Sequence, residues 1–415
     1  MQHPYPKHDF SHYLKLKDKN NDFVYLDIET TGLSRYYHVI TTVGYFYKGI
    51  FYVWVNGGDD THLRETLSKA KGIVTFNGSL FDLPFMLHHM GDIKFPPIHL
   101  DLRYVALRAK LTGGQKAIES ILSIDRYSSL TGKVNLTTGK SAPGLWFSYI
   151  RGNDNSLRDL KEYNKTDVLN MYHIGNIVSN ILENNKRKKS LDFKNHKIET
   201  VIFNKDKREM YTERIYYKDL PIDHPIRIVG IDLTGSVKRD TGVALMIGRL
   251  VTTDLLTTDD DIINYCVTNR ADLVSIDSPL TRPMEDEGIM RYSERLLKKR
   301  GVNVYPAYIP SMVGLTNRGI NLATRLKSLG FKVIESFPGA AQDIMGIPRK
   351  REGLDELIVG LSRFGLEGDF NSTKKTHDEI DAITSAVVGL FYLSDRYESL
   401  GRPDTDEALI IPKIL

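Results

Sequence analysis

Hydrophobic and polar residues alternate along this chain as in two successive α/β segments. The apolar runs 39–55 and 72–76 have the composition of strands. The stretches 61–69 and 157–180 have the apolar spacing of helices. The alternation begins again with the strand-like run Ile226–Asp232. We therefore predict an α/β fold of two domains, each with a mixed central sheet flanked by helices.

A basic and polar stretch separates the two halves. It begins with Lys186-Arg187-Lys188-Lys189 and continues to about Lys218. We interpret it as a solvated linker; the alternative is that Lys186 and Arg187 contact a nucleic-acid backbone. Residues 200–217 have the weak pattern of a short hairpin. The predicted parts are a first domain of residues 1–195, a linker of residues 196–222 and a second domain of residues 223–415.

Two carboxylates, Asp27 and Glu29, follow the apolar run Phe23–Leu26. They point to the same side of the predicted strand, because strand residues alternate between faces. Carboxylates so close repel each other unless cations neutralise them. Taken alone, the pair is equally well explained as surface acids at a strand end.

Further acids in the first half change this interpretation. Asp82 lies in an otherwise apolar segment, where an unpaired charge would be unfavourable. Tyr163 and Asp167 have the spacing that places two side chains on one helix face. Each residue also has a simpler explanation, as a helix N-terminal acid, a half-buried aromatic or a solvated charge.

Together these residues resemble the signature of the DEDD 3′→5′ exonucleases, tyrosine subtype, which have the ribonuclease H-like fold. The resemblance covers about residues 20–180. The context Asn77-Gly78-x-x-Phe81-Asp82 and the segment Lys116–Glu119 are similar to the exonucleases grouped as ribonuclease H-like, type 2. The signature Asp-x-Glu, Asp, Tyr-x-x-x-Asp is matched by Asp27, Glu29, Asp82, Tyr163 and Asp167.

The resemblance implies hydrolysis of phosphodiester bonds with two Mg²⁺ or Mn²⁺ ions. Asp27 would bridge both ions, and Glu29 and Asp167 would complete the site for the attacking water. Asp82 would hold the second ion through water. Tyr163 would orient the attacking water, since a phenol stays protonated at neutral pH. The implied substrate is the 3′ end of single-stranded DNA or RNA.

Two other residues of the first half are weaker candidates. Asn77 precedes Asp82 in the motif and is a candidate contact to the terminal nucleotide of the substrate. Asp101 follows a short extended element, and we expect it to be a structural acid rather than a supporting residue of the site.

The second half contains its own series of acids. Because open α/β sheets place their sites at the carboxyl ends of adjacent parallel strands, we expect Asp232, Asp277 and Glu335 to meet there. Asp378 and Asp381 are spaced to share a helix face. For each acid, a strand-end cap or a surface charge is the alternative.

This half resembles a family of uncharacterised proteins predicted to be ribonuclease H-like nucleases, distantly related to Holliday-junction resolvases. The resemblance spans about residues 226–393. It implies a second nuclease site in which these five acids are catalytic and Asp232 and Asp381 bind up to two metal ions. The matching motifs are Gly230-Ile231-Asp232, Ile276-Asp277-Ser278-Pro279, Glu335-Ser336-Phe337-Pro338 and Asp378-x-x-Asp381-Ala382. The candidate phosphate contacts are Arg282, Arg291 and Arg295.

Two other functions compete for the second half. It could be a catalytically silent platform that binds nucleic acid and presents ends to the exonuclease. The run Gly230–Ser236 also resembles the first phosphate loop of actin-like and sugar-kinase ATPases. Those enzymes need a second phosphate loop, and none follows Asp277, which makes the ATPase the weaker alternative.

Composition narrows the class of protein but does not identify a partner. Of 415 residues, 41% are hydrophobic and 26% charged, as expected for a globular protein. The formal net charge of +4 is too small to indicate nucleic-acid binding by itself. The single cysteine, Cys266, excludes intrachain disulfides and cysteine zinc sites. With no apolar stretch long enough for a membrane span or a signal peptide, we expect a cytoplasmic protein without a membrane partner.

Overall fold

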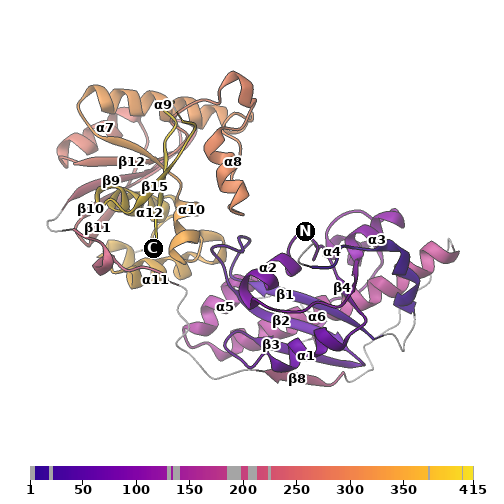
Figure 1. The fold of residues 1–415 in the computed structure, drawn as a ribbon. Coiled ribbons are helices and arrows are strands. Elements are labelled where there is room, and N and C mark those ends of the chain that lie inside the picture. The colour runs from indigo at the N-terminus through magenta and orange to yellow at the C-terminus, as the bar shows by residue number, and fades with distance from the viewer. Residues whose placement is uncertain are drawn as a thin grey trace. The chain divides into compact units, whose positions relative to one another are not determined.

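The computed structural model describes residues 5–17, 22–128, 132–133, 141–184, 198–203, 213–222, 226–372, 374–403 and 405–414. The chain divides into two compact units, Met1–Met210 and Tyr211–Leu415 (Figure 1). The basic run with Lys186 and Arg187 lies outside the described residues, as does the middle of the predicted hairpin. No helix among the described residues is long and apolar enough to cross a membrane.

A six-stranded mixed sheet forms the centre of the first unit, in the order β5-β4-β1-β2-β3-β8. β2 is antiparallel to β1 and β3, whereas β4 is parallel to both β1 and β5. β8 lies in the predicted linker and pairs in parallel with β3 at the edge of the sheet. The strands are β1 (Phe23–Thr30), β2 (Ile40–Tyr47), β3 (Ile50–Val55), β4 (Gly72–Thr75), β5 (Ile98–Asp101) and β8 (Thr200–Phe203).

Helices cover both faces of this sheet (Figure 1). One face packs against η1, α3, α4 and α6, and the other packs against α1 and α2. Tyr25 belongs to the face that α6 covers, so strand alternation directs Asp27 and Glu29 toward α6 as well. The helices are η1 (Phe10–Lys17), α1 (Thr61–Lys69), α2 (Asp82–Met90), α3 (Leu102–Arg108), α4 (Gln115–Ile121), α5 (Ala142–Ile150) and α6 (Asp154–Asn184), and β6 (Tyr127–Ser128) pairs with β7 (Gly132–Lys133).

The second unit is built on an eight-stranded mixed sheet, in the order β14-β11-β10-β9-β12-β13-β16-β15. Its central strand β9 is antiparallel to β10 and parallel to β12, which is parallel to β13. The relation of β9 to its neighbours therefore repeats that of β1 to β2 and β4. The strands are β9 (Arg227–Asp232), β10 (Thr241–Ile247), β11 (Leu250–Leu256), β12 (Leu273–Asp277), β13 (Val333–Ser336), β14 (Glu367–Gly368), β15 (Tyr397–Leu400) and β16 (Leu409–Pro412).

The buried helix α12 crosses β9 closely, because Gly230 has no side chain in its path. A Cβ atom on Gly230 would lie 2.1 Å from the main-chain oxygen of Ala382. α10 and α11 share the core on this face, and α7 and α9 cover the other. The helices are α7 (Asp259–Thr268), α8 (Tyr292–Lys299), α9 (Val313–Ser328), α10 (Pro338–Met345), α11 (Leu354–Phe364) and α12 (His377–Leu393), with short turns η3 (Tyr217–Asp219), η4 (Glu285–Glu287), η5 (Lys350–Glu352) and η6 (Asp369–Asn371). The predicted α/β fold, with a mixed sheet flanked by helices in each half, is confirmed.

Candidate active site

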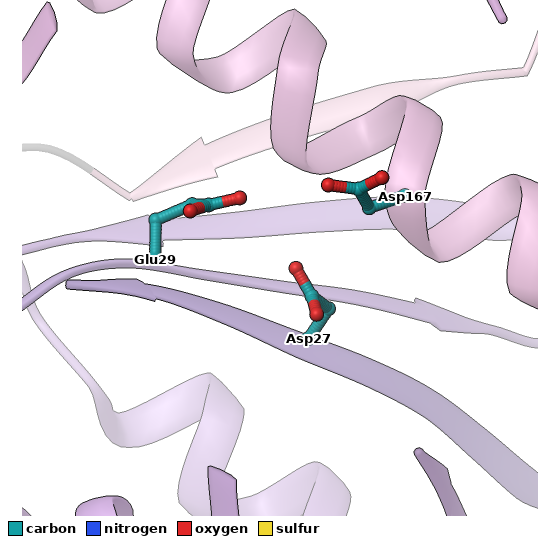
Figure 2. Close-up of side chains that lie close together, drawn as sticks. All are labelled: Asp27, Glu29 and Asp167. Atoms are coloured by element: carbon teal, nitrogen blue, oxygen red, sulfur yellow. The ribbon is translucent and has the colours of Figure 1, made fainter. Parts of the chain in front are cut away.

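Three acids of the first unit form a compact cluster. Asp27 and Glu29 come from β1, and Asp167 comes from α6, which covers that face of the sheet. Figure 2 shows their carboxylate groups converging, and one oxygen of each lies within 4.8 Å of the others. Among the described residues, this is the one group of three or more acidic, histidine or cysteine side chains that is so compact.

Asp82 lies beside this cluster, at the start of α2, and is buried. Its Oδ1 accepts a hydrogen bond from the main-chain N–H of Ile28 at 3.1 Å. The register between β4 and β1 ends at Tyr25, which leaves that N–H free of a strand partner on this side. Burial raises the pKa of Asp82 to about 7. Asp82 is therefore tied to the acid-bearing strand without belonging to the cluster of three.

The cluster is electrostatically unfavourable without cations. Burial, followed by repulsion from Glu29 and Asp82, raises the pKa of Asp27 well above its ordinary value. Burial and the charge of Asp167 do the same to the pKa of Glu29. Carboxylate oxygens are the ligands that Mg²⁺ and Mn²⁺ prefer. The donor set therefore fits one or more divalent ions.

Asn164 connects α6 to the acid-bearing strand. Its side-chain nitrogen donates hydrogen bonds to Asp27 Oδ2 at 2.9 Å and to the main-chain oxygen of Asp27 at 3.3 Å. Gly44 is the register partner of Asp27 on β2, and a Cβ there would lie 2.1 Å from Asn164 Oδ1. The glycine makes room for the asparagine, and neither residue stands out in the sequence.

Arg126 holds the acid that α6 contributes. Its guanidinium donates to Asp167 Oδ1 at 2.6 Å and to Glu119 Oε2 at 2.8 Å. Gln115 Nε2 donates to Glu119 Oε1 at 3.0 Å and to the main-chain oxygen of Asp167 at 2.8 Å. Because Glu119 is buried, the arginine is fixed between two carboxylates. Sequence reasoning missed Arg126, which belongs to no motif.

Tyr163 lies one helical turn before Asp167, as predicted, and its ring contacts two cations. Arg126 Cζ is 5.3 Å from the ring centroid, and Lys116 Nζ is 4.9 Å from it. Burial and the nearby charges of Asp167 and Glu29 raise the pKa of the phenol. The hydroxyl group therefore remains a hydrogen-bond donor across the neutral range.

Asn77 and Asp101 belong to the turn that leads into α2. The carboxylate of Asp101 accepts hydrogen bonds from the main-chain N–H groups of Asn77, at 2.8 Å, and Ser79, at 3.0 Å. The side-chain oxygen of Asn77 accepts from Arg103 Nη1 at 2.5 Å. Asp101 therefore fixes the turn that positions Asp82.

In the second unit, Asp232 and Asp277 meet at the carboxyl ends of β9 and β12, where they are register partners. Burial, followed by the charge of Asp381, raises the pKa of Asp277 to about 8. Burial and its neighbours Asp277 and Asp381 raise the pKa of Asp232 well above its ordinary value. Asp378 lies in the first turn of α12 and adds a smaller repulsion to Asp232.

Glu335 faces away from these acids, although its charge adds to the rise in the pKa of Asp277. It is in register with Ile276, so its side chain points to the opposite face of the sheet from Asp277. There Arg291 binds it with two hydrogen bonds, at 2.7 and 2.8 Å, and the N–H of Leu280 donates to it at 2.8 Å. The residue that extends the row of Asp232 and Asp277 is Ser336, the register partner of Asp277.

The arginines suggested as phosphate contacts are held by other parts of the second unit. Arg291 is buried and paired with Glu335. Arg282 donates to Asn317 Oδ1 at 3.0 Å, and Arg295 donates to the main-chain oxygen of Glu287 at 2.5 Å. A different arginine, Arg318, fixes the turn after Asp232.

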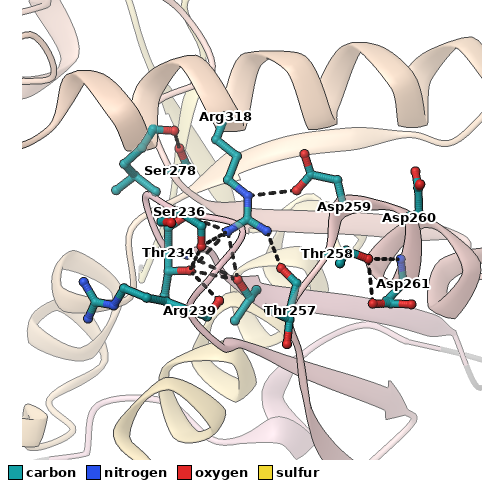
Figure 3. A network of polar contacts seen from close by, with 12 residues as sticks. Thr234, Ser236, Arg239, Thr257, Thr258, Asp259, Asp260, Asp261, Ser278 and Arg318 are labelled. Carbon is teal, nitrogen blue, oxygen red and sulfur yellow. Dashed lines mark hydrogen bonds and ion pairs between the residues drawn. The ribbon is translucent and has the colours of Figure 1, made fainter.

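Arg318 lies on α9, and its side chain is buried in a polar network (Figure 3). It donates to the main-chain oxygens of Thr234, at 2.8 Å, and Ser236, at 3.1 Å, and to Asp259 Oδ1 at 2.8 Å. The glycine turn that resembled a phosphate loop is therefore fixed by an arginine of its own unit. No pattern in the sequence indicated this role.

Comparison with known proteins gives a family match for part of the first unit. A family model described as the RNase H superfamily matches residues 24–179, which contain the whole acid cluster. Residues 24–179 of the first unit are thus similar to ribonuclease H-like domains. Among solved structures, Brucella melitensis NrnC is similar, at 18% identity over 41% of this chain and 78% of that chain, with a TM-score of 0.29. No curated protein shows significant sequence similarity to the chain.

The superfamily match and the acid cluster together indicate a metal-dependent nuclease. The exonuclease subtype and the family resemblance of residues 226–393 stay predictions.

Proposed function

We propose that the first unit is a 3′→5′ exonuclease that hydrolyses single-stranded DNA or RNA. The observation that carries the proposal is the cluster of Asp27, Glu29 and Asp167 on a ribonuclease H-like domain. Asp82 and Tyr163 complete the proposed catalytic set. Their order along the chain, with Tyr163 one turn before Asp167, supports the tyrosine subtype of DEDD exonucleases.

Asp27, Glu29 and Asp167 would hold the metal ions, and Asp82 would contact one of them through water. Two bound Mg²⁺ or Mn²⁺ ions would activate a water molecule and stabilise the leaving oxygen. The protonated hydroxyl of Tyr163 would orient that water by a hydrogen bond. Asn164 would keep the Asp27 carboxylate in place, and Arg126 would do the same for Asp167.

The test uses the full-length protein, freed of metal, with end-labelled DNA and RNA in single- and double-stranded form. Each substrate is incubated with Mg²⁺, Mn²⁺ or EDTA. We expect metal-dependent shortening from the 3′ end of single strands, with release of nucleoside monophosphates. Shortening from the 5′ end, or activity that persists in EDTA or in the Asp27→Asn variant, would contradict the proposal.

For the second unit we propose a further phosphodiester-cleaving site that includes Asp232, Asp277 and Asp381. The specific observation is that β9 and β12 bring Asp232 and Asp277 together in the strand arrangement of the first unit. Glu335 and Asp378 are not needed for this set, because Glu335 is bound by Arg291 on the other face and Asp378 is peripheral.

The alternative is that the second unit is a silent platform that binds nucleic acid. A variant that combines substitutions in both units distinguishes the two possibilities. In a chain whose first site is inactivated by Asp27→Asn, duplex, branched and single-stranded substrates are tested for residual cleavage. We expect cleavage that Asp232→Asn with Asp381→Asn abolishes. Binding of nucleic acid without any such cleavage would favour the platform.

A further inference from the structure

We propose that Lys350 supplies one of the positive charges of the second acid site, so that this unit binds a single divalent ion instead of two. The inference rests on the proposed second site, and it concerns how that site neutralises its carboxylates. The ammonium group of Lys350 would take the place of a second metal ion. Lys350 lies outside every motif in the sequence.

The first observation is that both oxygens of Asp381 already have partners. Lys350 Nζ lies 2.7 Å from Asp381 Oδ2, and Gln342 Nε2 donates to Asp381 Oδ1 at 3.0 Å. Gln342 is buried and also donates to Thr384 Oγ1 at 3.1 Å, which fixes its amide. A metal ion at Asp381 would have to share the carboxylate with the lysine, whose positive charge repels that ion.

The second observation is a buried hydroxyl group without a partner in the same row as the acids. Asp232, Asp277 and Ser336 are successive register partners on parallel strands, so their side chains share one face. Ser336 is 2% exposed, and its Oγ has no hydrogen-bond partner among the described residues. Buried hydroxyl groups are nearly always bonded, so this one points to a ligand or its water. The row thus offers oxygen ligands for one ion.

The third observation is the difference from the first unit. There, Arg126 occupies one oxygen of Asp167, yet three carboxylates still converge. In the described part of the second unit, no three acids come as close. Three converging carboxylates, the donor set that suits a bridged pair of divalent ions, are therefore found in the first unit and not in the described part of the second.

Lys350 is positioned to contact the phosphate of a substrate as well as the acids. It begins the short turn η5, and its side chain is 45% exposed while its ammonium group contacts the buried Asp381. Its charge also acts on Asp232 and Asp277. An ammonium group at the rim of an acid site attracts phosphate, which a second carboxylate-bound ion would otherwise do.

The test is the stoichiometry of Mn²⁺ binding, measured by titration calorimetry and by electron paramagnetic resonance of free Mn²⁺. The full-length chain carries Asp27→Asn and Glu29→Gln, which weaken the first site. We expect one ion, lost on adding Asp232→Asn. Adding Lys350→Met should admit a second ion or tighten binding by about tenfold or more, because a competing charge is removed. Lys350→Arg should restore the single-ion behaviour.

Lys327→Met is the matched control, since Lys327 is an exposed lysine of α9, and it should leave binding unchanged. Two ions bound with Lys350 intact, no ion bound, or a Lys350→Met chain that folds and binds as its parent would each overturn the inference. A chain that binds one ion with the expected lysine dependence but cleaves nothing would keep the inference and contradict the proposed second nuclease activity.

Discussion

The two units place acids at the end of the same kind of strand but neutralise them differently. β1 and β9 each have an antiparallel neighbour on one side and a parallel one on the other. In the first unit three carboxylates converge with one arginine at the margin. In the second, each carboxylate oxygen of Asp381 on α12 already has a partner, Lys350 or Gln342. A shared strand arrangement therefore fixes where the acids gather, while the flanking residues decide how many cations the site requires.

The helices also approach the sheets in different ways. In the first unit, Gly44 admits the side chain of Asn164, which reaches Asp27. In the second, Gly230 admits the backbone of α12 itself. A side chain can move aside at moderate cost, whereas a helix backbone cannot. We expect the first contact to matter mainly for the site and the second mainly for the fold.

The largest expected effect separates the two acid sites. Asp27→Asn should reduce 3′→5′ exonuclease activity by at least about 1,000-fold, since metal ligation supplies several kcal/mol of transition-state stabilisation. Asp232→Asn, the matching change on β9, should leave that activity within about twofold of the parent. Initial rates on an end-labelled single strand measure both. A loss of the 3′ activity with Asp232→Asn, while Asp27→Asn retains it, would reverse the assignment.

The next largest effect tests the two glycines. Gly230→Ala should destabilise the second unit by about 3 kcal/mol or more, because its Cβ would overlap the backbone of α12. Gly44→Ala should cost less stability, yet lower exonuclease activity by displacing Asn164. Gly114→Ala, whose Cβ would meet nothing within 4 Å, is the control. Urea unfolding followed by far-ultraviolet circular dichroism reports the stabilities, and equal losses for Gly44→Ala and Gly230→Ala would contradict the distinction.

Asp27 and Glu335 show which side-chain positions can be predicted from the sequence and which cannot. Asp27 and Glu29 follow a clear apolar strand, and simple alternation correctly predicts that they share a face. At the end of β13, both faces of the strand are buried, so alternation cannot tell whether Glu335 or Ser336 joins the acids. The candidate motif was recognisable because it contains two pairs of short fixed spacing, Asp27 with Glu29 and Tyr163 with Asp167. Arg126 and Lys350 were not, since each acts on an acid far away in the sequence.

An intermediate effect is expected where Arg126 holds Asp167. Arg126→Ala should lower exonuclease activity by about 10- to 100-fold, the usual effect of removing a residue that orients a metal ligand. Arg126→Lys should recover part of the loss, and Glu119→Gln should have a smaller effect of the same kind. The Mn²⁺ concentration for half-maximal activity should change with Arg126→Ala, which a purely structural role would not produce. Arg64→Ala is the control, because Arg64 pairs with Asp60 and Asp92 and not with an acid of the cluster, and an equal effect there would contradict the assignment.

A further effect is a pH dependence of stability that differs between the units when metal is removed. Asp82 has a folded pKa of about 7 and Asp277 one of about 8, against an ordinary value of 3.8. Between the ordinary and the folded values the native protein holds more protons than the unfolded chain, so stability falls as pH rises. Each group contributes up to about 1.4 kcal/mol per pH unit within its window.

Thermal unfolding in EDTA from pH 4.5 to 8.5 should therefore show decreasing stability with pH. The decrease due to Asp82 should end near pH 7, and that due to Asp277 should continue to about pH 8. Asp82→Asn should flatten the first decrease and Asp277→Asn the second, while Asp92→Asn, at an exposed position, should change neither. Stability that rises over this range in EDTA would mean that the buried acids are already neutralised by the chain. Because Lys350 and Arg126 each bring a single positive charge to a site with several buried acids, we expect the decrease to remain in both units.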